Sequence, residues 1–219
     1  MHAEYEPAMR ITDHDDRRFD IQKRRRVAEM SVEEMRRELL TSEVTGLRNR
    51  RAFYEAGPST VIALCDLDGL KALNRYGYTV GNAILQAKAK ALHRAGLDAY
   101  HDKGDEFLCR AENPEAIRAR LERARTILRN ASIQVKSADG TSLRVKGADF
   151  SYGIGMSLED AELRLKRQKA ERELRGELSR GRLCSISVIT EEAPMQVPAV
   201  AALNGLCEIT SVTPPVVQK

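Results

Sequence analysis

The stretch HDKGDEFLC, residues 101–109, places a glycine between a lysine and two adjacent acids. The flanking segments LDAYH and EFLCRA are strand-like, so the stretch predicts a β-hairpin with Asp105 and Glu106 at its tip. A further acid, Asp66, ends the apolar and β-branched run TVIALCD, which is typical of a buried strand. If the two elements are neighbours in one sheet, the three carboxylates meet at its edge.

Carboxylates held this close repel one another, and a hard cation relieves the repulsion. Mg²⁺ is held by a few carboxylates together with substrate phosphates, and two such ions activate a hydroxyl and stabilise a departing pyrophosphate. The pattern therefore indicates a phosphoryl- or nucleotidyl-transfer site. The plainer alternative is a turn made of turn-forming residues and a strand end capped by Asp66, with no chemistry attached.

The composition is that of one sizeable domain with appendages. Hydrophobic residues make up 42% of the 219 and charged residues 31%, which allows a packed core and a well-solvated surface. The net charge of +4 does not by itself favour nucleic acid or a membrane, and we expect neither as a partner. Four scattered cysteines form no zinc or disulfide pattern, and no apolar leader or spanning segment is evident. We expect a cytoplasmic protein.

The order of predicted elements indicates an α+β fold with a mixed, mainly antiparallel sheet and helices on its faces. Ser31 and Glu34 form a capping box, so a helix begins there, after an earlier helical stretch that carries the basic run 23–26. Three divisions of the chain are expected: a polar segment and helices over 1–40, a main domain over 41–183, and an extra strand and tail over 184–219. Further expectations are a helix from Asn49 to Gly57, one capped by Asn82 and closed by Gly96, one opened by Asn113 and Pro114, a hairpin turn at Asp139-Gly140, and a long helix from Ser157 to Gly181.

Several short motifs follow one another in a fixed order. They are VTGLRNRRAF (44–53), DLDGLKALN (66–74), GYTVGN (77–82), KGDEF (103–107) and SYGIG (151–155). Together they resemble the motifs of GGDEF domains, the diguanylate cyclases, over about residues 41–182. The resemblance implies a polymerase-palm-like sheet and the condensation of two GTP molecules into cyclic di-GMP. It also implies Mg²⁺ or Mn²⁺ as cofactor and a homodimer with one GTP on each protomer.

The resemblance assigns roles residue by residue. It implies that Asp105 and Glu106 are catalytic and help to deprotonate the ribose 3′-hydroxyl. The implied metal ligands are Asp66, Leu67 through its backbone carbonyl, Asp105 and Glu106. The implied nucleotide-binding residues are Asn74 and Asn82 at the base, and Gly69, Leu70, Lys71, Lys103, Gly104 and Arg182 at the phosphates.

The sequence also departs from the family pattern. Lys103 replaces the first glycine of the signature, and its side chain either contacts phosphate or fills the site. Asn82 stands where the family has an aspartate, and it either only caps a helix or changes the base choice towards adenine. Leu178 stands in place of a phosphate-binding lysine, for which Lys166 or Lys169 can compensate. His101 replaces an arginine and is interpreted as structural, and the product-inhibition motif is not clean, so no feedback inhibition is predicted.

Three functions follow from these residues. The first is an active cyclase that uses GTP and dimerises through the N-terminal helices. The second is a degenerate domain that binds a nucleotide or a protein without catalysis. The third keeps the metal chemistry but makes a product that contains adenine, from ATP.

Overall fold

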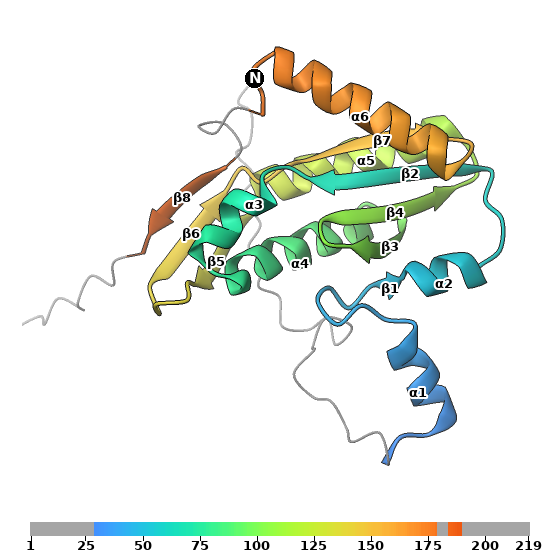
Figure 1. Cartoon of the computed structure of the whole chain (residues 1–219), viewed down its shortest axis with the longest axis horizontal. Coiled ribbons are helices and arrows are strands. Elements are labelled where there is room, and N and C mark those ends of the chain that lie inside the picture. The colour runs from blue at the N-terminus through green and yellow to red at the C-terminus, as the bar shows by residue number, and fades with distance from the viewer. Residues whose placement is uncertain (1–28, 179–183, 190–219) are drawn as a thin grey trace, which may run out of the picture. The chain divides into compact units, whose positions relative to one another are not determined.

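The computed structural model describes residues 29–178 and 184–189 of the chain. The chain divides into two compact units, Met1–Ile189 and Thr190–Lys219, and the second unit lies outside the described residues. The first unit contains a five-stranded sheet of order β1-β3-β4-β2-β7 and a three-stranded sheet of order β5-β6-β8 (Figure 1). In the larger sheet only β1 and β3 pair in parallel, so the predicted α+β fold with a mainly antiparallel sheet is confirmed.

The elements have the following bounds. The strands are β1 (Arg48–Asn49), β2 (Val61–Leu67), β3 (Asp98–Lys103), β4 (Glu106–Ala111), β5 (Ser132–Lys136), β6 (Ser142–Lys146), β7 (Phe150–Gly155) and β8 (Ser185–Val188). The helices are α1 (Val32–Leu39), α2 (Arg50–Glu55), α3 (Leu70–Leu73), the 3₁₀ turn η3 (Asn74–Tyr76), α4 (Tyr78–Arg94), α5 (Pro114–Asn130) and α6 (Leu158–Leu174). Among the described residues, no helix has the length and apolar character needed to cross a membrane.

Both faces of the larger sheet are covered by helices. Along β2, Ala63 and Cys65 belong to a core cluster shared with α4 and α5. Leu64 belongs to a second cluster shared with α2 and α6 on the opposite face. Because side chains alternate along a strand, a strand buried on both faces is apolar throughout. This explains the unbroken run TVIALCD and confirms the predicted buried strand.

The helix N-termini follow the predicted capping residues. The Asn49 side chain accepts a hydrogen bond from the backbone of α2, Asn113 does the same for α5, and Ser157 for α6. Ser31 and Glu34 form the predicted capping box of α1. Such side chains satisfy backbone N–H groups that the first helical turn leaves unpaired.

Helix α6 lies directly on β7 because two glycines make room for it. A Cβ atom added at Gly153 would overlap the backbone of α6 at Ala161 and Leu165, and one added at Gly155 would overlap it at Ala161. The glycines of SYGIG therefore allow the helix backbone to approach the strand more closely than any side chain would permit. The position of α6 matters because two of its cations reach the acids described below.

Two helix boundaries differ from the prediction. Helix α4 begins at Tyr78 after Gly77, which has φ 114°, so Asn82 lies inside the helix and is not its cap. The prediction was wrong because residues 78–81, placed in the preceding loop, are already helical. Helix α6 ends at Leu174 rather than near Gly181, because Gly176 adopts a left-handed conformation with φ 69° two residues later.

The three-stranded sheet was not predicted as a separate layer. The expected hairpin of β5 and β6 is present, with Gly140 at φ 86° in its turn, and β8 pairs with β6 within the expected last strand. The sequence pattern identified these strands but held no signal for which sheet they join. The N-terminal stretch with the basic run 23–26 and the residues from 190 onward lie outside the described residues.

Candidate functional site

The tip of the β3–β4 hairpin is shaped by one glycine and one histidine. Gly104 has φ 54°, a conformation that glycine adopts without strain, and the β3–β4 register shifts between His101 and Lys103. The ring of His101 lies 3.0 Å from the Gly104 carbonyl and 2.6 Å from the Ser42 hydroxyl, through Nε2 and Nδ1 respectively. A carbonyl only accepts hydrogen bonds, so Nε2 donates and Nδ1 accepts. Burial lowers the pKa of His101, which fits this neutral ring, and both contacts agree with the predicted structural role.

The predicted convergence of the acids is confirmed. In the antiparallel pairing of β2 with β4, Asp66 lies directly opposite Glu106. Asp105 precedes this pair, and its backbone carbonyl accepts a hydrogen bond from the Leu67 N–H at 3.2 Å. The three acids therefore occupy one edge of the sheet, with the Leu67 backbone beside them.

Two of the three acids hold a lysine. Lys169 of α6 places its Nζ 2.5 Å from Oδ1 of Asp66, and Lys103 places its Nζ 3.5 Å from Oε2 of Glu106. Within the described residues, no hydrogen bond or ion pair engages the Asp105 carboxylate. Lys169 is one of the two lysines expected to compensate for Leu178, whereas Lys166 pairs with Glu162 on the surface of α6. Leu178 itself follows the end of α6.

A buried ion network lies immediately behind this edge. Asp68, two residues after Asp66, receives hydrogen bonds from Arg172 at 2.6 Å and from Ser151 at 2.8 Å. Burial raises the pKa of Asp68 despite these partners. Asp149 accepts a hydrogen bond from Arg172 at 2.8 Å and two from Arg125, from Nε at 3.0 Å and from Nη2 at 2.9 Å.

The two buried acids of this network differ in their electrostatics. Burial acts to raise the pKa of Asp149, but hydrogen bonds from Arg125 and Arg129 outweigh it and hold that pKa below its usual value.

Arg172, which binds both of these acids, was not singled out from the sequence. Its place on α6, three residues after Lys169, was the available signal.

A fully buried lysine lies on the other face of the sheet. Lys88 of α4 donates hydrogen bonds from Nζ to the backbone carbonyls of Cys65 and Asp105, both at 3.0 Å. Burial lowers the pKa of Lys88, and the negative charges of Asp66 and Asp105 oppose that change. Sequence reasoning missed this residue because lysine in the middle of a helix is normally solvent-facing.

The predicted base-binding asparagines are close together at the start of α4. A Cβ atom added at Gly81 would overlap Oδ1 of Asn74, so the Asn74 side chain lies against the backbone beside Asn82. Asn82 is exposed, as is Tyr78, one helical turn before it on the same face.

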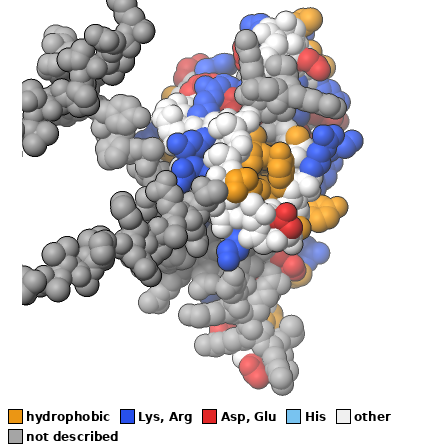
Figure 2. Space-filling view, turned by 90° about the vertical axis from the view of Figure 1, so that its left-hand side faces the viewer, with side chains coloured by type: hydrophobic (Ala, Val, Ile, Leu, Met, Phe, Trp, Pro, Cys, Tyr) orange, Lys and Arg blue, Asp and Glu red, His pale blue; other side chains and the backbone are white. Residues whose placement is uncertain are grey.

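The predicted phosphate-binding segment begins at Gly69, which has φ 79° and precedes α3. Leu70 and Lys71 form the first turn of that short helix, and the Lys71 side chain is exposed. Figure 2 views the molecule from the side on which α3 and the three-stranded sheet lie in Figure 1. Its Lys and Arg side chains border an apolar area. Arg182, the remaining predicted phosphate contact, lies outside the described residues.

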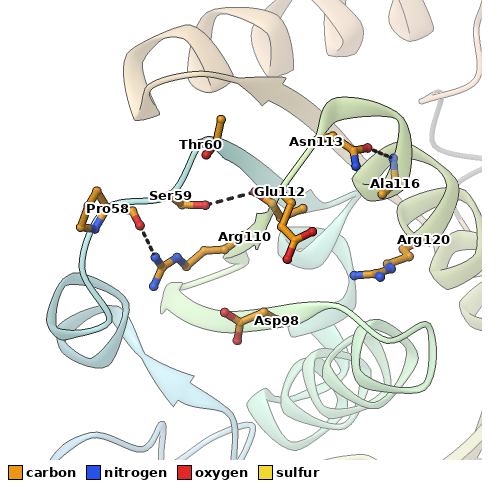
Figure 3. Close-up of a pocket in the computed structure, with 10 residues that line it drawn as sticks. Pro58, Ser59, Thr60, Asp98, Arg110, Glu112, Asn113, Ala116 and Arg120 are labelled. Carbon is orange, nitrogen blue, oxygen red and sulfur yellow. Dashed lines mark hydrogen bonds between the residues drawn. The ribbon is translucent and has the colours of Figure 1, made fainter.

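A cavity of about 510 Å³ lies away from these acids, at the opposite end of β4. It is bordered by the 58–60 loop, Asp98, Arg110 and the first turns of α5 (Figure 3). The Arg110 guanidinium spans its rim and donates to the Pro58 carbonyl at 2.7 Å. None of the predicted site residues lines this cavity.

The acidic edge has donors that suit a hard divalent cation only in part. In the described part of the chain, no group of three or more His, Cys, Asp or Glu side chains is arranged to hold a metal ion. Asp66 and Glu106 nevertheless offer paired carboxylates, each already holding a cationic ammonium group, and the backbone of Leu67 adjoins them through its hydrogen bond to the Asp105 carbonyl. Such a set fits Mg²⁺ or Mn²⁺ that takes its remaining ligands from substrate phosphates and water.

No protein-family model matches the sequence. A curated relative, described as an uncharacterized protein in the hutH 5′ region of Streptomyces griseus, is 35% identical over an alignment 102 positions long that covers 41% of this chain and 36% of that protein. The chain thus spans little more than a third of the length of the curated relative that it matches.

Among solved structures, the diguanylate cyclase SiaD of Pseudomonas aeruginosa, in complex with its activator SiaC, matches with a TM-score of 0.53. Its identity is 22%, over 63% of this chain and 60% of that one. The coiled coil and GGDEF domain of DgcB from Caulobacter crescentus, in complex with c-di-GMP, matches with a TM-score of 0.49 and 21% identity over 66% and 85% of the two chains. The fold of the chain is that of a GGDEF domain, as the motif order predicted.

Proposed function

We propose that the chain is a nucleotidyl cyclase of the GGDEF family that condenses two GTP molecules into cyclic di-GMP. The observation that carries this proposal is the β2–β4 register, which sets Asp66 opposite Glu106 with Asp105 at the adjoining tip. The GGDEF fold and the ordered motifs support it.

In the proposed reaction, the 3′-hydroxyl oxygen of one GTP bonds to the α-phosphorus of the other. The bond from that phosphorus to its bridging oxygen breaks, and pyrophosphate leaves. The carboxylate of Glu106 or Asp105 accepts the hydroxyl proton. Bound Mg²⁺ or Mn²⁺ would neutralise charge on the phosphates. A second, reciprocal condensation closes the ring, so two protomers must face each other, each holding one GTP.

The chain's own residues divide the remaining work. Asp66, Glu106 and the Leu67 carbonyl would hold the cation, and the segment from Gly69 to Lys71 would face the phosphates together with Gly104. Lys169 and Lys103 pass from their carboxylates to the triphosphate when the nucleotide binds. This exchange frees the acids as the phosphates arrive, because phosphate oxygens attract an ammonium group at least as strongly.

Helix α1 provides a surface for the proposed homodimer. Val32, Met35 and Leu39 lie at spacings of three and four residues, and they are 80%, 38% and 57% exposed. Apolar residues at this spacing form a stripe suited to packing against an identical helix.

A second candidate function is nucleotide binding without turnover. It is favoured by the two lysines on Asp66 and Glu106, since ammonium groups there compete with a metal ion. A third candidate is a cyclase that accepts ATP. It is favoured by Asn82, which is exposed and does not cap α4, so its amide is available to a base.

The deciding experiment incubates the purified full chain with Mg²⁺ or Mn²⁺ and GTP, ATP or both, and identifies products by mass spectrometry. Wild type is expected to form cyclic di-GMP, and Asp105→Asn, which is nearly isosteric, is expected to reduce turnover by about a hundredfold or more without unfolding. An adenine-containing product would favour the third function. Thermal protection by GTP without any product would favour the second. Undiminished turnover in Asp105→Asn would contradict the catalytic role of that residue.

A further inference from the structure

Lys88 occupies a position that helical periodicity assigns to the protein core. It lies four residues after Ile84 and four before Leu92, and all three side chains are completely buried. Its ammonium group lies over the ring of Phe107 at 4.3 Å and over that of Phe150 at 5.2 Å. Two aromatic rings and two backbone carbonyls therefore enclose this charge, and it forms no ion pair with a carboxylate in the described part of the chain.

Stability alone does not account for a lysine at this position. Burying an ammonium group costs several kcal/mol unless it is paired, and hydrogen bonds and ring faces offset only part of that cost. An apolar residue of similar volume is commonly neutral or stabilising in such a place. The position therefore carries a charged donor for a reason other than the strength of the core.

The two carbonyls that Lys88 binds belong to the acidic edge. One is the carbonyl of Cys65, which precedes Asp66, and the other is that of Asp105 itself. The regular β2–β4 register ends at Asp66 and Glu106, so Asp105 lies beyond the ladder. Its carbonyl is fastened to β2 by the Leu67 N–H at 3.2 Å and to α4 by Lys88. One oxygen thus accepts from two elements at once.

We propose that Lys88 is a positioning residue that holds the hairpin tip, and with it the Asp105 carboxylate, against the end of β2. Lys88 acts from the opposite face of the sheet through the backbone, and it contacts neither nucleotide nor metal. Its effect on turnover rests on the proposed cyclase function, whereas the placement of Asp105 does not. A group held in this way is placed by the core rather than by the mobile end of a turn.

The test compares Lys88→Met with Leu92→Met, a buried substitution one helical turn further along α4 that removes no polar contact. Amide hydrogen exchange is followed by NMR, together with thermal unfolding. Lys88→Met is expected to retain or raise the melting temperature and to make the Leu67 amide exchange about tenfold faster, while amides in the middle of β2 keep their rates. Leu92→Met should leave the Leu67 amide unchanged. Lys88→Gln, which keeps one donor, should give an intermediate rate and serves if the methionine variant does not fold.

The kinetic expectation is a fall in kcat of about tenfold to a hundredfold in Lys88→Met, with KM for the nucleotide little changed, because the binding groups stay in place. An unchanged Leu67 amide would overturn the proposal, as would faster exchange along all of β2 with a lower melting temperature. A wild-type Leu67 amide that exchanges as fast as an exposed one would overturn it without any variant. Absence of turnover in wild type would overturn the cyclase function and leave the exchange result standing.

Discussion

Asp66 and Asp68 are two residues apart at the end of one strand, and both contact a cation of α6, yet their surroundings are opposite. Asp66 holds one lysine whose side chain is 35% exposed. Asp68 is buried and held by an arginine that also binds Ser151 and Asp149. A single, partly exposed ion pair exchanges partners more easily than a network of buried hydrogen bonds does. The comparison therefore separates Asp66, whose lysine partner can be exchanged, from Asp68, which helps to hold α6 against the sheet.

The largest expected effect on stability comes from a substitution in the buried network around Asp68 and Asp149. Arg172→Met leaves Asp68 and Asp149 buried with fewer partners, which should reduce the free energy of unfolding by about 3–5 kcal/mol. Urea denaturation followed by circular dichroism measures the loss. Arg164→Met, on the same helix, removes only an exposed pair with Asp160, and should cost less than about 1 kcal/mol. Equal losses in the two variants would show that the buried network carries no special weight.

The pH dependence of stability sharpens the same contrast. The folded-state pKa of Asp149 lies below the ordinary 3.8, so its stabilising contribution is present above that pH and is lost as the pH falls through the lower folded value. Burial raises the pKa of Asp68, so a falling pH favours the folded state at this residue, because protonation removes the cost of burying its charge. We expect Asp149→Asn to be less stable than wild type at pH 7. We also expect it to lose less stability than wild type does as the pH falls from about 4 to about 2. Unfolding curves from about pH 7 to pH 2 provide the measurement. Parallel curves for the two proteins would contradict the assignment.

The smallest effect on stability is expected at the partly exposed ion pair between Lys169 and Asp66. Lys169→Met should change the free energy of unfolding by less than about 1 kcal/mol. It frees Asp66, so Mn²⁺ should bind roughly fivefold more tightly without nucleotide, as read by electron paramagnetic resonance. Turnover should nevertheless fall by about a hundredfold, because the phosphates lose a cation. Lys166→Met, one turn earlier and paired with Glu162, is the matched control and should alter neither quantity. Unchanged Mn²⁺ affinity in Lys169→Met would show that the lysine does not compete for Asp66.

The sequence predicted the parts of this site that local patterns encode. The run TVIALCD predicted a strand that ends at Asp66, and the KGDEF turn predicted a hairpin tip at Asp105 and Glu106, because strand alternation and hairpin geometry are local rules. Their convergence was predicted only on the condition that the two elements are neighbours in one sheet, which the β2–β4 pairing supplies. The caps at Asn49, Asn113 and Ser157 followed from equally local chemistry. Asn82 was misplaced as a cap because its residue type suits that role, while the helix had already started at Tyr78.

The residues that were missed depend on tertiary packing. Lys88 has the spacing of a core residue but the side chain of a surface residue, and only the fold decides between the two. Arg172 lies in a charged helix whose sequence does not reveal which of its many cations face the sheet. For the same reason the sequence named Lys169 only as one of two alternatives, with Lys166. The separate three-stranded sheet was missed for the same reason, since strand pairing over long distances leaves no short-range pattern.

The glycines that let α6 pack closely on β7 also fix where its two cations lie relative to Asp66 and Asp68. Lys169 and Arg172 are three residues apart, about 4.5 Å along a helix axis, and Asp66 and Asp68 are about 6.6 Å apart along an extended chain. The two spacings are similar, so both cations can reach their acids at once. They do so only while the helix keeps its position along its axis and its rotation about that axis. Deleting one residue between Leu165 and Lys169 would turn both cations by about 100° at once. Asp66 and Asp68 would therefore lose Lys169 and Arg172 together. The different environments of the two acids thus depend on the same alignment of α6 with the sheet.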